Sequence, residues 1–144
     1  GYKNEPVVAT VKLADIIEAK GYSCKVSVHA ANLPDDADIE KIAAALRPGD
    51  VFCHVFSPKK PGIFGADGKI LPGIWEAKKR GVLMDCCNGR VHWSFDFYKR
   101  AIEQGFFPDI ISSDVILYLF LKCMDKGVRL SSDKAFKPVT TRVE

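Results

Sequence analysis

The stretch Arg47-Pro-Gly-Asp-Val-Phe-Cys-His-Val55 decides the fold, because it joins the end of a helix to the start of a strand. Its Pro-Gly pair ends a helical pattern in which apolar residues recur at i, i+3, i+4 and i+7. Those apolar residues are Ile39, Ile42, Ala43 and Leu46. The apolar run that follows is short and bounded, which is typical of a strand. A helix that leads directly into a buried strand predicts an α/β fold with a parallel sheet.

The same alternation of helical patterns and short apolar runs extends on both sides of this stretch. Strands are predicted at residues 25–29, 51–55, 82–86 and 109–113. Helices are predicted at residues 7–17, from Ile39, from Pro72, at residues 95–102 and at residues 117–126. A Pro34-Asp35-Asp36 turn is expected to open the second helix, and Pro72 suits the first position of the third. No linker composition interrupts this rhythm, so residues 1–144 are interpreted as a single α/β domain.

The composition is that of one water-soluble globular domain, with 47% hydrophobic and 27% charged residues. The formal charge is +3 and the basic residues are scattered, so no nucleic-acid partner is expected. The longest apolar run, residues 115–121, is far shorter than the roughly 20 residues of a membrane span, so no membrane association is expected. Five cysteines without a C-x-x-C pattern argue against a disulfide framework and a structural zinc knuckle, which predicts a cytoplasmic location.

Polar side chains follow the predicted strands at their carboxyl ends, where ligands bind in parallel α/β folds. His29 ends the first strand, His54 lies at the end of the second, and Asp114 follows the fourth. Two imidazoles and one carboxylate form a recurring catalytic metal shell with an open position. We therefore interpret these three residues as ligands of a divalent metal ion. Asp114 would also accept a proton during hydrolysis of a carbonyl compound.

Simpler roles stay open for these and neighbouring residues. A single strand-end histidine is more often a hydrogen-bonded structural residue than a ligand, and Asp114 can cap the helix that follows it. Asp85 is interpreted as a buried hydrogen-bonding residue, and His92 can serve in capping or stacking at the start of a helix. Cys86 and Cys87 are interpreted as small core residues rather than nucleophiles.

The glycine-rich stretch Gly62-Ile-Phe-Gly-Ala-Asp-Gly-Lys69 is not a phosphate-binding P-loop. Ile63 stands where the first glycine of that motif is needed, and Ile70 stands where Ser or Thr is required. We expect a flexible loop at the active edge, with a turn at Ala66-Asp67-Gly68.

Several of these stretches together resemble the amidohydrolase superfamily, specifically its branch of deacetylases and dihydroorotase-like enzymes. The similarity is specific in order and spacing and covers nearly the whole chain. It rests on Lys25-Val-Ser-Val-His29, on Leu46-Arg-Pro-Gly-Asp-Val-Phe-Cys-His-Val-Phe56, on the 62–69 stretch, on residues 76–85, on Ser94-Phe95, on residues 101–109, on Ile111-Ser-Ser-Asp114, and on residues 127–131 and 139–142.

The resemblance implies a (β/α)8 metal-dependent hydrolase of amide bonds, acting on N-acyl amino acids or on cyclic amides. In this family, histidines ending the fifth and sixth strands bind metal, and an aspartate ending the eighth strand is both ligand and general base. These positions correspond to His29, His54 and Asp114. The family usually carries two divalent ions, commonly zinc.

The chain departs from the family pattern in three places. The H-x-H pair of the first strand and the bridging lysine of the fourth have no counterpart here, so the chain resembles the C-terminal half of the barrel and is expected to hold one zinc ion at most. The substrate-contacting histidine of the family's G-H-G loop is replaced by Asn88 before Gly89. We assign Asn88, Gly89 and His92 to substrate binding. Asp114 also continues directly into residues 115–119, where the family has a longer loop.

A four-stranded half barrel would leave two strand edges and an apolar inner face uncovered. A homodimer that rebuilds a pseudo-barrel, a doubly wound sheet with helices on both faces, or a complementing half barrel from another segment would each cover them. The first two are favoured over a solitary open half barrel, because apolar patches of that size seldom persist on soluble monomers.

The leading functional interpretation is a metal-dependent hydrolase of small-molecule amides, or the C-terminal part of one. One rival is a noncatalytic barrel remnant that acts as a small binding or oligomerising module. A weaker rival is a purely structural oligomerising domain.

Overall fold

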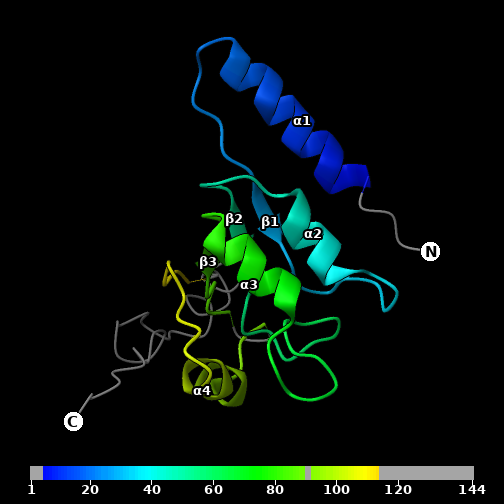
Figure 1. Ribbon diagram of the computed structural model, residues 1–144, viewed down its shortest axis with the longest axis vertical. Helices are drawn as coiled ribbons and strands as arrows, with labels where there is room; N and C mark the ends of the chain where they lie inside the picture. Colours follow the sequence, from blue (N-terminus) through cyan, green and yellow to red (C-terminus); the bar gives the residue numbers. More distant parts are fainter. Residues whose placement is uncertain (1–4, 90–91, 114–144) are drawn as a thin grey trace, which may run out of the picture. The chain divides into compact units, whose positions relative to one another are not determined.

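The computed structural model describes residues 5–89 and 92–113, which belong to one compact unit. Helices and strands alternate along this part of the chain (Figure 1). Their bounds are α1 Glu5–Ala19, β1 Ser27–His29, α2 Ile39–Ala45, β2 Val51–Cys53, α3 Pro72–Lys79, β3 Leu83–Asp85 and α4 Phe95–Glu103. Each of these elements was predicted from the sequence pattern, and the three strands are shorter than predicted. The predicted helix at residues 117–126 lies outside the described residues.

The three strands form a parallel sheet in the order β1-β2-β3. Their register aligns His29 with Cys53 and Cys53 with Asp85, so the last residues of all three strands form one row across the sheet. Because side chains alternate between faces, the middle residues of the strands point the other way. Of these middle residues, Phe52 and Met84 are fully buried.

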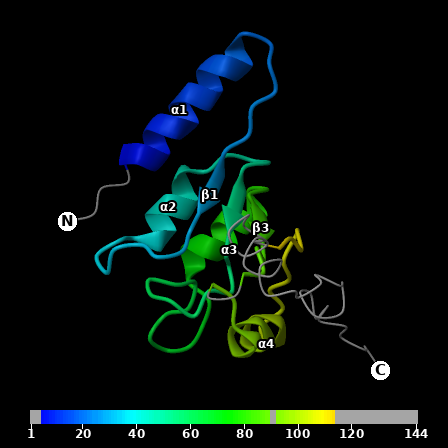
Figure 2. The ribbon, with the colours of Figure 1, turned by 180° about the vertical axis from the view of Figure 1, so that it is seen from behind.

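Helices α2 and α3 cover one face of this sheet. Each of α1, α2, α3 and α4 contributes buried residues to the same apolar cluster, which also contains Phe52 and Met84. In Figures 1 and 2, α2 and α3 lie side by side against the sheet. Helices on a single face of a parallel sheet are typical of a (β/α)8 barrel, whereas a doubly wound sheet has helices on both faces. The described residues therefore have the architecture of part of a barrel.

The start of α2 differs from the prediction. The sequence predicted that the Pro34-Asp35-Asp36 turn opens this helix, but Asp38 is its N-cap, because the Asp38 carboxylate accepts a hydrogen bond from the backbone N–H of Lys41 at 3.1 Å. The prediction for Pro72 is confirmed, since this residue is the first of α3.

The predicted strand at residues 109–113 is present only as isolated parallel bridges of Ile110 with Asp85 and of Ser113 with Asn88. A continuous ladder does not form, because side chains take part of the hydrogen bonding. The Asp109 carboxylate accepts from the N–H of Met84 at 2.9 Å, and the Asp85 carboxylate accepts from the N–H of Ser112 at 3.3 Å. The fourth strand position of the barrel is therefore occupied by irregular chain.

The loop before α3 contains the predicted turn. The N–H of Gly68 donates to the carbonyl of Gly65, and the Asp67 carboxylate accepts from the N–H of Lys69. Gly68 has φ +76°, a conformation that favours glycine. Ile63 and Ile70 are buried and anchor this loop in the core. The expected flexibility of the loop stays a prediction. Within the described ranges, none of the helices combines the length and the apolar character that crossing a membrane requires.

Candidate metal centre

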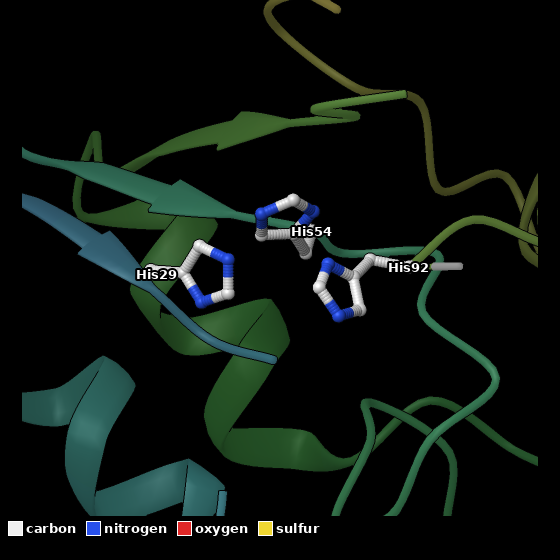
Figure 3. Close-up of side chains that lie close together, drawn as sticks. All are labelled: His29, His54 and His92. Carbon is white, nitrogen blue, oxygen red and sulfur yellow. The ribbon is translucent and has the colours of Figure 1, made fainter. Parts of the chain in front are cut away.

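Three imidazole rings meet at the carboxyl edge of the sheet (Figure 3). The ring centroids of His29 and His54 are 4.2 Å apart, those of His54 and His92 are 5.0 Å apart, and those of His29 and His92 are 5.4 Å apart. Each ring offers one nitrogen within 4.8 Å of a nitrogen of the other two. His54 and His92 are buried, whereas His29 is exposed, so the cluster opens to solvent on the side of β1.

The backbone brings each histidine to this point in a different way. His29 is the last residue of β1. His54 follows the last residue of β2 and has φ +64°, so strand geometry ends there and simple alternation of side chains no longer applies to its ring. His92 lies in the loop between β3 and α4, and this loop contacts the segment after β2, because the N–H of Ser94 donates to the carbonyl of Phe56 at 3.0 Å.

A hydrogen-bond chain orients the ring of His92. Lys59 Nζ donates to Asn32 Oδ1, so the amide nitrogen of Asn32 faces His92 and donates to its Nε2 at 2.8 Å. In the neutral ring the proton then lies on Nδ1, the nitrogen that faces the other two histidines in Figure 3. The Nδ1–H group of His92 is therefore a hydrogen-bond donor that points toward the rings of His29 and His54.

The rings of His29 and His54 are of the type that binds a transition-metal ion. Neutral imidazole is the commonest ligand for such ions, and nitrogens 2.0–2.1 Å from a tetrahedral zinc ion lie roughly 3.3 Å from one another. The nitrogens of the cluster lie within 4.8 Å of one another. His29 and His54, the two histidines predicted to bind metal, thus lie together at one edge of the sheet.

The other predicted site residues lie in different surroundings. Asp114, the predicted third ligand and general base, is outside the described residues. Asn88 is exposed and its N–H donates to the carbonyl of Ser112, and Gly89 is buried. The substrate-binding roles of Asn88, Gly89 and His92 stay predictions.

The residues at the end of β3 have definite environments. Asp85 is buried and hydrogen-bonded, as predicted, and Cys86 belongs to the apolar core, as predicted. Burial raises the pKa of the Cys86 thiol to about 12, so it is protonated at neutral pH. Burial also raises the pKa of the Cys87 thiol to about 12, but its Sγ donates to the Asp85 carboxylate at 3.2 Å. Cys87 is thus part of a polar cluster and not a core residue as predicted.

One contribution to this site was not predicted from the sequence. It is Asn32, whose amide positions His92 although 60 residues separate the two. The sequence feature that could have pointed to Asn32 is its position three residues after His29, which ends β1. His92, which the sequence assigned to substrate binding, lies beside the two strand-end histidines because of the path of the loop between β3 and α4.

Comparison with known proteins places this chain among larger relatives. No family model matches it. It is 29% identical over 111 residues to a deacetylase of Enterococcus faecalis, an alignment that covers 76% of this chain and 30% of that protein. It is 31% identical over 108 residues to a deacetylase of Brucella anthropi, covering 75% of this chain and 26% of that protein.

The solved structures that the chain resembles are also larger proteins, of which it covers a part. The chain superposes on an adenine deaminase with a TM-score of 0.66 and 26% identity, covering 81% of this chain and 30% of the other. It superposes on a dihydroorotase with a TM-score of 0.62 and 26% identity, covering 80% of this chain and 28% of the other. The chain thus spans about 30% of the length of the relatives that it matches.

Proposed function

From the chain's resemblance to the C-terminal half of an amidohydrolase-superfamily barrel, of the deacetylase and dihydroorotase-like branch, we propose that it is the metal-binding part of a hydrolase of amide bonds. The proposed substrates are small molecules, either N-acyl amino acids or cyclic amides. The observation that carries the proposal is the convergence of His29 and His54 at the carboxyl edge of a parallel sheet. This edge is where barrel enzymes hold their reacting groups.

We propose that His29, His54 and Asp114 would hold one divalent ion, with zinc as the preferred metal. When bound, such an ion lowers the pKa of a coordinated water and polarises a carbonyl group. Asp114 would accept the proton of the attacking water. His92, whose donor faces the cluster, would hold the carbonyl oxygen of the substrate, and Asn32 would keep the ring in the required tautomer. Asn88 and Gly89 would contact the remainder of the substrate.

Metal analysis of the purified, zinc-loaded chain tests the ligand assignment. With the thiolate cluster removed by Cys53→Ser/Cys87→Ser, we expect about one zinc per chain bound through the histidine cluster, with binding weakened at least tenfold by His29→Ala, His54→Ala or Asp114→Ala. His92→Ala is the matched variant, because it removes an imidazole from the same cluster but not a proposed ligand. Equal losses of zinc affinity in His92→Ala and His54→Ala would contradict the separate roles of the two rings. An unchanged affinity in His54→Ala would contradict the site, and protein whose stability ignores zinc would favour the noncatalytic remnant.

Hydrolysis assays test the activity itself. The zinc-loaded chain is incubated with a panel of N-acetyl amino acids and cyclic amides, and free amine or carboxylate is measured. We expect turnover that falls at least 100-fold in Asp114→Asn, because a positioned general base contributes at least that factor. Metal binding without turnover on any substrate would leave the chain with the role of a metal-binding module.

Further parts of the same proposal concern assembly and location. Leu83 and Val51 on the face opposite the described helices are only half-buried, so we propose that this face is covered in the working protein. The remaining barrel strands, from a second copy or from a complementing half barrel, would supply that cover. Cys24, Cys53, Cys86 and Cys87 are free thiols, which supports a cytoplasmic location.

A further inference from the structure

A second cluster of metal-ligand types lies beside the histidines on the sheet. Cys53 ends β2, Asp85 ends β3, and Cys87 follows Asp85 by two residues. The two sulfur atoms and a carboxylate oxygen all lie within 4.8 Å of one another. Cys53 and Asp85 are register partners on neighbouring strands, so their side chains leave the same face of the sheet.

The backbone turns Cys87 back toward this pair. Cys87 has φ +41°, a conformation that residues other than glycine adopt rarely, and its N–H donates to Asp85 Oδ1 at 3.1 Å. Its Sγ lies 3.2 Å from Asp85 Oδ2. Strain of this kind concentrates at functional sites. The strained turn therefore brings the Cys87 thiol to the carboxylate that lies beside Cys53.

The spacing of these atoms suits a single ion. With sulfur at about 2.3 Å and oxygen at about 2.0 Å from a tetrahedral zinc ion, a sulfur and an oxygen ligand lie roughly 3.5 Å apart. The observed 3.2 Å between Cys87 Sγ and Asp85 Oδ2 is within a few tenths of an ångström of that value. A metal ion can thus take the place of the thiol proton that now lies between these two atoms.

Hydroxyl groups surround the three candidate ligands. Ser112 Oγ lies 2.9 and 2.8 Å from the two oxygens of Asp85 and 3.5 Å from Cys87 Sγ. Ser27 Oγ lies 3.1 Å from Cys53 Sγ. Hydroxyl donors of this kind stabilise thiolate and carboxylate ligands and fix their orientation around a metal. Each ligand thus has a hydroxyl partner.

We propose that Cys53, Asp85 and Cys87 form a second metal site, one that takes a borderline or soft divalent ion such as Zn²⁺. On binding, each thiol loses its proton to solvent, two sulfur–metal bonds and one oxygen–metal bond form, and no group is oxidised or reduced. Thiolates select such ions over Mg²⁺ and Ca²⁺. The site is distinct from the histidine cluster, since it shares no ligand with it, although Cys53 precedes His54 directly.

Cobalt(II) titration of the reduced chain tests the proposal, because Co²⁺ substitutes for Zn²⁺ and reports thiolate ligands by sulfur-to-metal charge-transfer absorption. We expect this absorption in the wild-type chain and its loss in the Cys53→Ser/Cys87→Ser variant. Cys24→Ser is the matched control, since Cys24 is another free thiol outside the cluster, and it keeps the absorption. His54→Ala also keeps the absorption, so failure of the histidine site and failure of the thiolate site are distinguishable.

Wild-type protein that binds Co²⁺ without charge-transfer absorption would overturn the proposal, and this result does not depend on how any variant folds. An absorption that survives in the double variant would overturn it as well. A third contrary result is a Cys53–Cys87 disulfide that forms under mild oxidation in protein whose reduced form binds no thiophilic metal, because the pair would then serve in redox chemistry. Retention of the absorption in Cys24→Ser and His54→Ala, with its loss in the double variant, supports the site.

Discussion

At the scale of single residues, Arg47 and Asp50 form an ion pair that links several elements of the fold. The Asp50 carboxylate is fully buried and accepts from Arg47 Nε and Nη2, both at 3.1 Å, and from the N–H of Val26 at 2.9 Å. Arg47 Nη1 also donates to Asp15 and Glu18 on α1. The pair thus links α1 to the starts of β1 and β2. The Arg-Pro-Gly-Asp stretch that follows α2 therefore also stabilises the packing of these elements.

Removing the guanidinium tests how much this contact stabilises the protein. Arg47→Met would leave the Asp50 charge buried without its cation, which typically costs about 3–5 kcal/mol of unfolding free energy. Urea unfolding followed by circular dichroism at pH 7 measures the change. Lys79→Met is the matched control, because it removes an exposed ion pair with Glu76 and should cost less than about 1 kcal/mol. Similar losses in the two variants would contradict the role of the buried pair.

The same carboxylate predicts a pH dependence of stability. Burial raises the pKa of Asp50, but the hydrogen bonds from Arg47 and Val26 lower it more, so the pKa lies below its usual value of about 4. A carboxyl whose folded pKa is depressed stabilises the fold above its unfolded pKa, and this contribution is lost as the pH falls through the folded pKa. We therefore expect the unfolding free energy of the wild type to fall below about pH 4 more steeply than that of Asp50→Asn. Parallel acid profiles would show that Asp50 does not titrate in this way.

At the scale of elements, the N-cap of α2 decides how the chain enters its second βα unit. Asp38→Ala removes the acceptor for the N–H of Lys41 and should cost about 1 kcal/mol of unfolding free energy. Asp35→Ala removes a carboxylate from the preceding loop and should cost less than about 0.5 kcal/mol. Thermal unfolding at pH 7 compares the two variants. A larger loss in Asp35→Ala would instead favour the Pro34-Asp35-Asp36 turn as the start of the helix.

At the scale of the whole molecule, one apolar cluster joins all the described helices to the sheet. Phe52 lies on the central strand and is fully buried, so Phe52→Ala should cost about 3–5 kcal/mol in one cooperative transition. Phe107 is 56% exposed, and Phe107→Ala should cost less than about 0.5 kcal/mol. Calorimetry measures both variants, and two separate transitions would contradict a single core in this unit.

The positions of the helices were predictable, because apolar spacing and stop signals such as Gly21 and Gly105 are local features. The strand at residues 109–113 was overpredicted, because its apolar pattern carries no information about Asp85 and Asp109 taking hydrogen bonds from the backbone. The meeting of His29 and His54 was predictable from parallel topology, since both residues follow strands that end at the same edge.

Local patterns of residues are enough to specify the alternation of helices and strands, the parallel sheet, and the edge at which polar groups gather, because these features depend on periodicities of a few residues. Which side chains meet at that edge depends instead on the folded arrangement of the chain. The φ angle of His54, the path of the loop that carries His92, and the turn that brings Cys87 beside Asp85 and Cys53 all arise from packing between distant segments. Contacts of this kind depend on strand register and loop conformation, which local patterns of residues do not encode.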